Sequence, residues 1–184
     1  MSTFFTSDQH LGHRNIIDYC NRPFADVPAM DEAIVSNWNA TVGPDDVVYV
    51  LGDLALGRLA DSLALAADLN GRKLLVPGNH DRVWEGHRKP SQHAAYEAAG
   101  FEVLPSQVPL DLDGTEVLLC HFPYEGDSHD RDRYEHMRPV DRGGWLLHGH
   151  VHTTWKRKDR MVNVGVDVWD YAPAPAEAIL ALMS

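Results

Sequence analysis

Histidines, carboxylates and one amide follow several apolar runs of this sequence, at points where strands are expected to end. In the segment LLHGHVHTTW, His148, His150 and His152 alternate directly after such a run. The other positions of this kind are Asp8 with His10, Asp53, Asn79 with His80, and His121. Ligands in open α/β sheets bind outside the carboxyl ends of the strands, where residues remote in sequence meet at one edge. The pattern therefore predicts a site rich in carboxylate and imidazole.

Metal binding is the chemistry that these side chains suit best. Carboxylate oxygen, amide oxygen and neutral imidazole nitrogen favour Mn, Fe or Zn, whereas Ca²⁺ would need more oxygen ligands and a structural Zn²⁺ more thiolates. The candidate ligands are Asp8, His10, Asp53, Asn79, His121, His150 and His152. This set exceeds what one tetrahedral ion uses, but two ions that share a bridging carboxylate use all of it. We expect two divalent ions, manganese first, with iron, zinc, nickel or magnesium as alternatives.

The first half of the chain is expected to position these residues with alternating strands and helices. Strands are predicted over 2–8, 46–53 and 73–77, with a loop after the first of them and amphipathic helices over 28–42 and 57–70. This order favours right-handed crossovers and a mainly parallel sheet. The fold class is therefore α/β in this half.

The second half is expected to be rich in strands. After a short helix over 90–100, strands are predicted over 101–104, 107–112, 115–121, 144–150 and 161–169, and a helix over 173–183 ends the chain. The polar segment 122–144 is too long for an ordinary connection and is predicted to be a functional surface loop with one helical turn. Its arginines could bind a phosphate group, but we favour the alternative that they form solvent-exposed ion pairs with neighbouring acidic residues. The arginines are Arg131, Arg133 and Arg138, and the acids are Asp130, Asp132 and Glu135.

Composition limits the class of protein. The 184 residues fit one domain, and the net charge of −11 argues against binding to long nucleic acid, which needs Lys and Arg to replace phosphate counterions. No apolar run approaches the roughly 20 residues that span a bilayer. With two separated cysteines and no signal pattern at the N-terminus, we expect a cytoplasmic protein without membrane segments.

The ordered series SDQH, LGD, PGNHD, LCH and HGHVH resembles the calcineurin-like metallophosphoesterase family, whose pattern is D-x-H, G-D, G-N-H-[DE], H and G-H-x-H. The five blocks extend from Asp8 to His152, which is most of the chain. The resemblance implies a four-layer fold of two stacked mixed sheets flanked by helices, formed by residues 1–184 as a single domain. It explains why a parallel first half passes into a strand-rich second half.

The same resemblance implies an activity and a role for each residue. Asp53 would bridge two ions, and a hydroxide held between them would attack a small phosphodiester or phosphomonoester. One ion would be bound by Asp8, His10 and His152, and the other by Asn79, His121 and His150. His80 would protonate the leaving group, with Asp81 orienting it.

The substrate is expected to be small, because a short chain leaves little room for a capping domain or a long groove. Nucleotides such as 2′,3′-cyclic nucleotides are the preferred substrates by family analogy, ahead of monoesters and nucleic-acid ends. His13, Arg14 and Asn15 follow the first ligand pair and are expected to line the substrate pocket. His148 is expected to be a pocket residue or to lie just behind the ligands.

Three alternative classes of protein fit the sequence less well. A non-catalytic metal-binding scaffold for protein interactions would not need His80 as a proton donor. A metallo-β-lactamase-like hydrolase would need an Asp-His pair where Thr153 and Thr154 stand. A helical metal-dependent phosphohydrolase is excluded because the candidate ligands follow strands.

Overall fold

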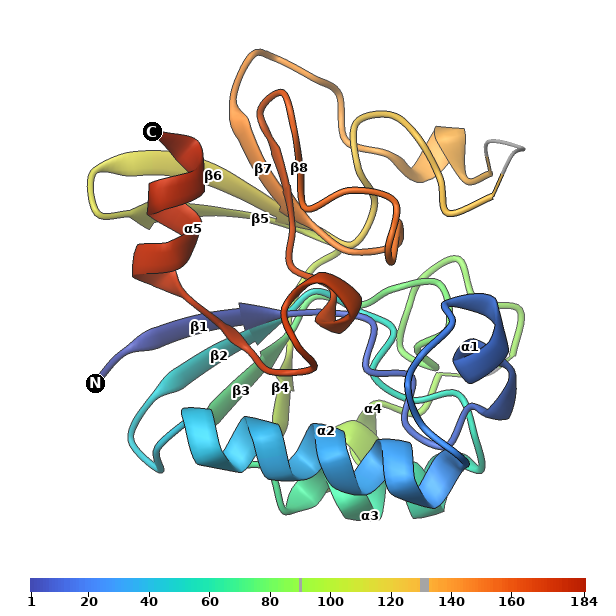
Figure 1. The fold of residues 1–184 in the computed structure, drawn as a ribbon. Helices are drawn as coiled ribbons and strands as arrows, with labels where there is room; N and C mark the ends of the chain where they lie inside the picture. The colour runs from blue at the N-terminus through green and yellow to red at the C-terminus, as the bar shows by residue number, and fades with distance from the viewer. Residues whose placement is uncertain (90, 130–132) are drawn as a thin grey trace.

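A computed structural model describes residues 1–89, 91–129 and 133–184 of the protein (Figure 1). Its described strands are β1 (Thr3–Thr6), β2 (Val47–Val50), β3 (Arg72–Leu75), β4 (Phe101–Val103), β5 (Gln107–Leu112), β6 (Thr115–Cys120), β7 (Trp145–His148), β8 (Arg157–Lys158), β9 (Met161–Asn163) and β10 (Ala174–Pro175). The described helices are α1 (Arg14–Tyr19), α2 (Val27–Thr41), α3 (Leu59–Ala67), α4 (His93–Ala98) and α5 (Ala176–Met183), with 3-10 turns η1 (Glu135–Met137) and η2 (Val166–Val168). These strands form two five-stranded sheets, which confirms the predicted α/β class.

The first sheet has the order β10-β1-β2-β3-β4. Strands β1 to β4 are parallel, and β10 pairs antiparallel with β1 at the edge. Successive side chains of a strand point to opposite faces, so Phe4 packs into the core beneath the helices and Phe5 into the core between the sheets. The predicted alternation of strands and helices is confirmed.

Helices α2, α3 and α4 cover the outer face of the first sheet (Figure 1). Asp26 caps α2, since its side chain accepts a hydrogen bond from the amide of Ala29 at 2.9 Å, and the helix buries Ile34 and Trp38 against the sheet. Helix α1 differs from the sequence prediction, which is a loop after Asp8. Its six residues form less than two turns.

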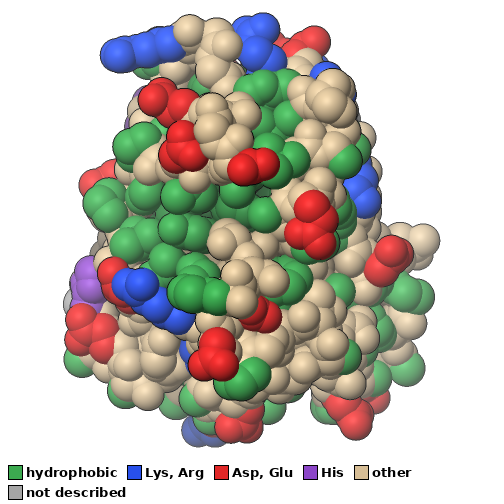
Figure 2. Space-filling view, turned by 90° about the vertical axis from the view of Figure 1, so that its left-hand side faces the viewer, with side chains coloured by type: hydrophobic (Ala, Val, Ile, Leu, Met, Phe, Trp, Pro, Cys, Tyr) green, Lys and Arg blue, Asp and Glu red, His purple; other side chains and the backbone are tan. Residues whose placement is uncertain are grey.

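The second sheet has the order β5-β6-β7-β9-β8, with β6, β7 and β9 parallel. Val117, Leu147 and Val162 of these strands face the first sheet across a shared core. Helix α5 packs Ile179 into the same core. Hydrophobic side chains also gather on the surface of the face that carries α5 (Figure 2).

The described residues of the 122–144 loop cover the other face of the second sheet. Its Phe122, Tyr134 and Met137 pack with Leu146 of β7, and the single turn η1 agrees with the predicted helical turn. The fourth layer of the expected sandwich is therefore made by this loop rather than by long helices. Asp130, Arg131 and Asp132, for which pairing was predicted, lie outside the described residues.

The predicted strand over 161–169 is shorter than expected. Strand β9 ends at Asn163, Gly165 forms a bridge with Ser7, and the chain continues as η2. This turn directs residues 164–169, which were predicted to continue the strand, toward the end of β1. None of the described helices is long and apolar enough to cross a membrane.

Candidate metal centre

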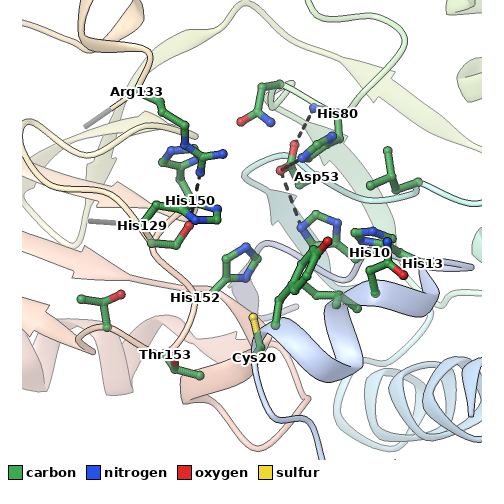
Figure 3. Close-up of a pocket in the computed structure, with 17 residues that line it drawn as sticks. His10, His13, Cys20, Asp53, His80, His129, Arg133, His150, His152 and Thr153 are labelled. Carbon is green, nitrogen blue, oxygen red and sulfur yellow. Dashed lines mark hydrogen bonds and ion pairs between the residues drawn. The ribbon is translucent and has the colours of Figure 1, made fainter. Parts of the chain in front are cut away.

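The predicted ligands meet because parallel strands of both sheets end near one cavity. Asp8, Asp53 and Asn79 follow β1, β2 and β3, and His121 and His150 follow β6 and β7. The cavity has a volume of about 620 Å³ (Figure 3). Asp8 and His121 are fully buried behind its wall. The predicted ligands that line it are His10, Asp53, Asn79, His150 and His152.

Asp53 lies between the two predicted sets of ligands. Its Oδ2 atom is 3.7 Å from Nε2 of His10 and 3.4 Å from Nε2 of His121. Within the first set, Oδ1 of Asp8 is 3.8 Å from Nε2 of His10. Donor atoms of Asp8, His10 and His152 all lie within 4.8 Å of one another, as do those of Asp8, Asp53 and His121. This spacing is compatible with two neighbouring cations.

Several of these donor atoms are buried without a hydrogen-bond partner in the described part of the chain. They are Oδ1 of Asp8, both ring nitrogens of His10, Oδ1 of Asn79 and Nε2 of His121. Buried polar atoms nearly always have a hydrogen-bond partner in folded proteins. A cluster of buried oxygen and nitrogen atoms without such partners therefore indicates that a bound ligand completes the structure. Their oxygen and nitrogen atoms suit Mn, Fe or Zn, so the residues fit the divalent ions that the sequence predicts.

Hydrogen bonds to three histidines leave one ring nitrogen of each available for a cation. Nδ1 of His121 lies 2.7 Å from a backbone carbonyl oxygen. Nδ1 of His152 lies 3.0 Å from Oδ2 of Asp167, and Nε2 of His150 lies 3.3 Å from Oδ2 of Asp127. Because carbonyl and carboxylate oxygens accept, these nitrogens donate, and in the neutral ring the opposite nitrogen carries the lone pair that a cation would use. Histidines that bind metals commonly show this arrangement.

Arg22 connects the His152 side of the site to the end of β1. Its guanidinium donates to both carboxylate oxygens of Asp167, at 2.8 and 3.0 Å, and to the carbonyl oxygens of Asp8 and Gln9, at 2.7 and 3.0 Å. No more than 1% of either side chain of the ion pair is exposed. Arg22 and Asp167, like Asp127, were missed from the sequence, because each acts on residues far away along the chain.

Five of the predicted ligands have a left-handed backbone conformation. The φ angle is 60° at Asp8, 53° at His10, 55° at Asp53, 70° at His150 and 48° at His152. Residues other than glycine seldom adopt this region, and it occurs at functional sites where the surrounding structure maintains it. The ligands are therefore presented from tight turns at the strand ends.

Two glycines let these turns approach one another. Gly52 has φ of 84°, and a side chain there would collide with the backbone of Gly78 and the ring of His121. A side chain at Gly149 would collide with those of Ser7 and Asp8. The close packing of the strand ends thus depends on the absence of Cβ at both positions.

Asp81 stabilises the turn that carries Asp53. Its Oδ2 atom accepts hydrogen bonds from the amides of Asp53 and Gly78, both at 2.8 Å, and its Oδ1 atom accepts one from the hydroxyl of Tyr96 at 3.3 Å. Burial and the charge of Asp53 raise the pKa of Asp81 to about 7. These contacts position backbone beside the ligands, and the orientation of His80 by Asp81 stays a prediction.

Burial and charge shift the titration of the metal-free site. Burial lowers the pKa of His10 well below its ordinary value and that of His13 to about 4. Burial alone would raise the pKa of Asp53 and lower that of His121, but their attraction reverses both shifts. The pKa of Asp53 falls well below its usual range and that of His121 rises to about 9. Without a cation, these two residues form a buried ion pair.

The remaining predicted residues divide between the cavity wall and its surroundings. His80, His13 and Asn15 line the cavity. Arg14 lies outside the described wall, because it forms an exposed ion pair, at 3.3 Å, with an acid one turn along α1. His148 also lies outside it, fully buried, with Nδ1 donating to the carbonyl of the next residue at 2.7 Å. Neither Arg14 nor His148 lies in the described cavity wall, and the buried position of His148 agrees with the second of its two expected places, just behind the ligands.

Three segments supply further cavity-wall residues. Helix α1 and its end provide Ile16, Tyr19 and Cys20, the 122–144 loop provides Ser128, His129 and Arg133, and the segment after β7 provides Thr153 and Thr154. The α1 residues were missed because the helix itself was not predicted. The signal that could have identified them is the apolar character of Ile16 and Tyr19, which follow the predicted ligands Asp8 and His10 in the sequence.

Residues 1–181 match the calcineurin-like phosphoesterase superfamily domain, and the chain belongs to this superfamily. The fold, the site and the family together define a hydrolase that acts on phosphoester bonds. The donor cluster agrees with metal dependence.

Similar proteins extend over nearly the whole chain. The gene 66 protein of Mycobacterium phage L5 is 36% identical, with 91% of this chain and 87% of the phage protein covered. An uncharacterized protein of Methanocaldococcus jannaschii is 31% identical, with 98% of this chain and 90% of that protein covered. The crystal structure of a protein of unknown function from Aquifex aeolicus has a TM-score of 0.73 at 27% identity and covers 98% of both chains.

Proposed function

We propose that this protein is a binuclear metal-dependent phosphoesterase that hydrolyses small phosphodiesters or phosphomonoesters, with nucleotides such as 2′,3′-cyclic nucleotides first among them. The observation that carries the proposal is the convergence of oxygen and nitrogen donors with His80 on one cavity. Residues 1–184 would form one catalytic unit. We also propose a cytoplasmic setting, which the free thiols of Cys20 and Cys120 support.

In the proposed centre, Asp53 would contribute its carboxylate to both ions. Asp8, His10 and His152 would hold the first ion, and Asn79, His121 and His150 would hold the second. Bound divalent ions, manganese first, would supply the Lewis acidity that polarises a phosphoryl group and activates water. The position of Asp53 Oδ2 between His10 and His121 supports the shared role.

His80 is proposed to donate a proton to the leaving-group oxygen. Its side chain is 39% exposed at the cavity wall, and Nε2 lies 3.9 Å from Oδ2 of Asp53. Its backbone amide donates to Oδ1 of Asp53 at 2.9 Å, which fixes the residue beside the proposed bridging carboxylate. The ring can therefore face both a bound phosphoryl group and solvent, as a general acid requires.

The cavity wall supports a small organic substrate. Ile16, Leu56 and Tyr19 supply apolar surface beside the donor cluster, and the rings of Tyr19 and His13 meet edge to face at 6.4 Å between centroids. The tyrosine side chain is exposed at the rim, where its ring could stack on a nucleobase. A volume of about 620 Å³ is in the range of small-molecule sites.

A substrate and metal panel tests the proposal. Cyclic nucleotides, nucleotide monoesters and bis-aryl phosphates would be assayed with Mn²⁺, Mg²⁺, Ni²⁺ and Zn²⁺. We expect metal-dependent turnover, highest on a cyclic nucleotide. Absence of metal-dependent turnover on every ester would overturn the enzymatic proposal and favour the non-catalytic metal-binding alternative.

The role of His80 is tested by leaving-group dependence. His80→Ala should retain both ions and lose about 10²- to 10⁴-fold in kcat on a substrate with an alcohol leaving group. The loss should be much smaller with p-nitrophenolate, which leaves without a proton. His93→Ala removes an exposed histidine of α4 and serves as the control. Equal losses with the two leaving groups would contradict the proton-donor role.

A further inference from the structure

Asp127 is a buried carboxylate in the 122–144 loop that sequence reasoning did not single out. Its side chain is fully buried, and its oxygens accept hydrogen bonds from the amides of His129 and Arg133, at 3.1 and 3.0 Å. Both carboxylate oxygens are therefore held in place by the backbone of the loop that carries them.

One contact of this carboxylate is with a proposed metal ligand. Nε2 of His150 donates to Oδ2 of Asp127 at 3.3 Å, so Nδ1 is the ring nitrogen left for a cation. The His150 ring also packs edge to face against Phe122 and Tyr134 of the same loop, at 5.0 and 5.7 Å between centroids. The loop thus fixes both the plane and the tautomer of this ligand.

The other side-chain contact is with the cavity wall. Nη2 of Arg133 donates to Oδ1 of Asp127 at 2.8 Å, and Nε lies 3.2 Å from Oδ2. The Nε and Nη2 edge of the guanidinium is occupied by these bonds, whereas Nη1 makes no hydrogen bond to the described residues. Arg133 lines the cavity, with its side chain beside His150 (Figure 3). Its remaining N–H groups are therefore held where a substrate anion can reach them.

We propose that Asp127 is a positioning residue that fixes the metal ligand His150 and the substrate-facing Arg133 together, so that the 122–144 loop is part of the active site. The proposal rests on the proposed function. The sequence favoured solvent-exposed ion pairs for Arg133. In the structure the partner of Arg133 is instead a buried carboxylate, which also accepts a hydrogen bond from the proposed ligand His150.

Loss of a carboxylate behind a ligating histidine typically lowers metal affinity about 10- to 100-fold. The effect of Asp127→Asn should be confined to the ion held by His150, because His152 has its own carboxylate partner in Asp167. Arg133→Met should leave both ions bound and raise KM about tenfold with kcat little changed, since it removes a charge-assisted hydrogen bond to substrate.

The experiment is a titration of metal-free protein with Mn²⁺, in which free Mn²⁺ is measured by electron paramagnetic resonance. Wild type, Asp127→Asn and Asp141→Asn would be compared. Asp141 lies in the same loop and loses the same charge, but its ion pair with Arg160 is exposed and 3.6 Å long. We expect one of two sites weakened 10- to 100-fold in Asp127→Asn alone, in protein whose near-UV circular dichroism is native.

Hydrogen exchange of the wild-type protein gives a second measurement that needs no variant. Mn²⁺ should slow exchange of the His129 and Arg133 amides, because both donate to Asp127. Unchanged exchange at both amides, or wild-type affinity for both ions in Asp127→Asn, would overturn the positioning role. An unchanged KM in Arg133→Met would overturn the substrate contact. Wild-type protein that binds fewer than two Mn²⁺ ions would instead refute the binuclear function itself.

Discussion

Replacing Arg22 by methionine should destabilise the protein far more than the same replacement at Arg14. Both arginines pair with an aspartate in the described structure, but their surroundings differ. Arg22 is fully buried with Asp167, whereas 57% of the Arg14 side chain is exposed beside Asp18. The comparison isolates burial, because the substitution is the same.

The magnitude follows from what each substitution leaves behind. Arg22→Met strands the buried Asp167 carboxylate with His152 as its remaining described partner, and removes the donor to two buried carbonyls. Removing one member of a buried ion pair costs about 3–5 kcal/mol. An exposed i,i+4 pair contributes about 0.3–0.5 kcal/mol. At roughly 2–4 °C per kcal/mol for a chain of this size, Arg22→Met should lower Tm by about 6–20 °C.

Denaturant unfolding of the metal-free proteins measures both values, with thermal unfolding as a check. We expect a lower midpoint for Arg22→Met at an unchanged slope, and a midpoint for Arg14→Met close to that of wild type. A cost below about 1 kcal/mol for Arg22→Met, or equal costs for the two variants, would refute the reasoning from burial.

Two further substitutions test the surroundings of the site. His148→Ala should leave both ions bound in elemental analysis, because its ring belongs to none of the groups of neighbouring donor atoms in the described structure and its Nδ1 donates to the carbonyl of Gly149; loss of either ion would show that it is a ligand. Burial raises the pKa of Asp31, although the Gly12 amide donates to its oxygens at 3.1 Å. A raised folded-state pKa favours the protonated form, so the associated stability is present at low pH and is lost as pH rises through that pKa. The neutral variant Asp31→Asn should therefore gain Tm relative to wild type at pH 7 and lose that advantage near pH 3, whereas a pH-independent difference would argue against burial as the cause.

Strands β1 to β7 and β9, helices α2 and α3 and the candidate ligands could be predicted because their signals are local, whereas the two-residue strands β8 and β10 were not predicted. Apolar runs that end in Asp, Asn or His mark strand ends, and the parallel order of β1 to β3 brings those ends to one edge. Helix α1 lacked such a signal, since six residues without a capping side chain show little periodicity.

The residues behind the ligands could not be found in this way. Asp127 lies 23 residues from His150 in a loop without periodicity, and Arg22 lies 145 residues from Asp167. Asp167 itself occupies an alternating segment that resembles a strand, in which a charged residue is expected to face solvent. Only the turn after β9 directs it inward.

The left-handed turns at the ligands determine how an inactive variant of this protein is best made. Asparagine tolerates φ near 60° better than alanine does. Alanine at Asp8 or Asp53 would remove a ligand and also impose about 1–2 kcal/mol of backbone strain, whereas asparagine removes the charge and keeps the turn. A variant intended to trap uncleaved substrate in an otherwise native cavity should therefore carry asparagine at these positions.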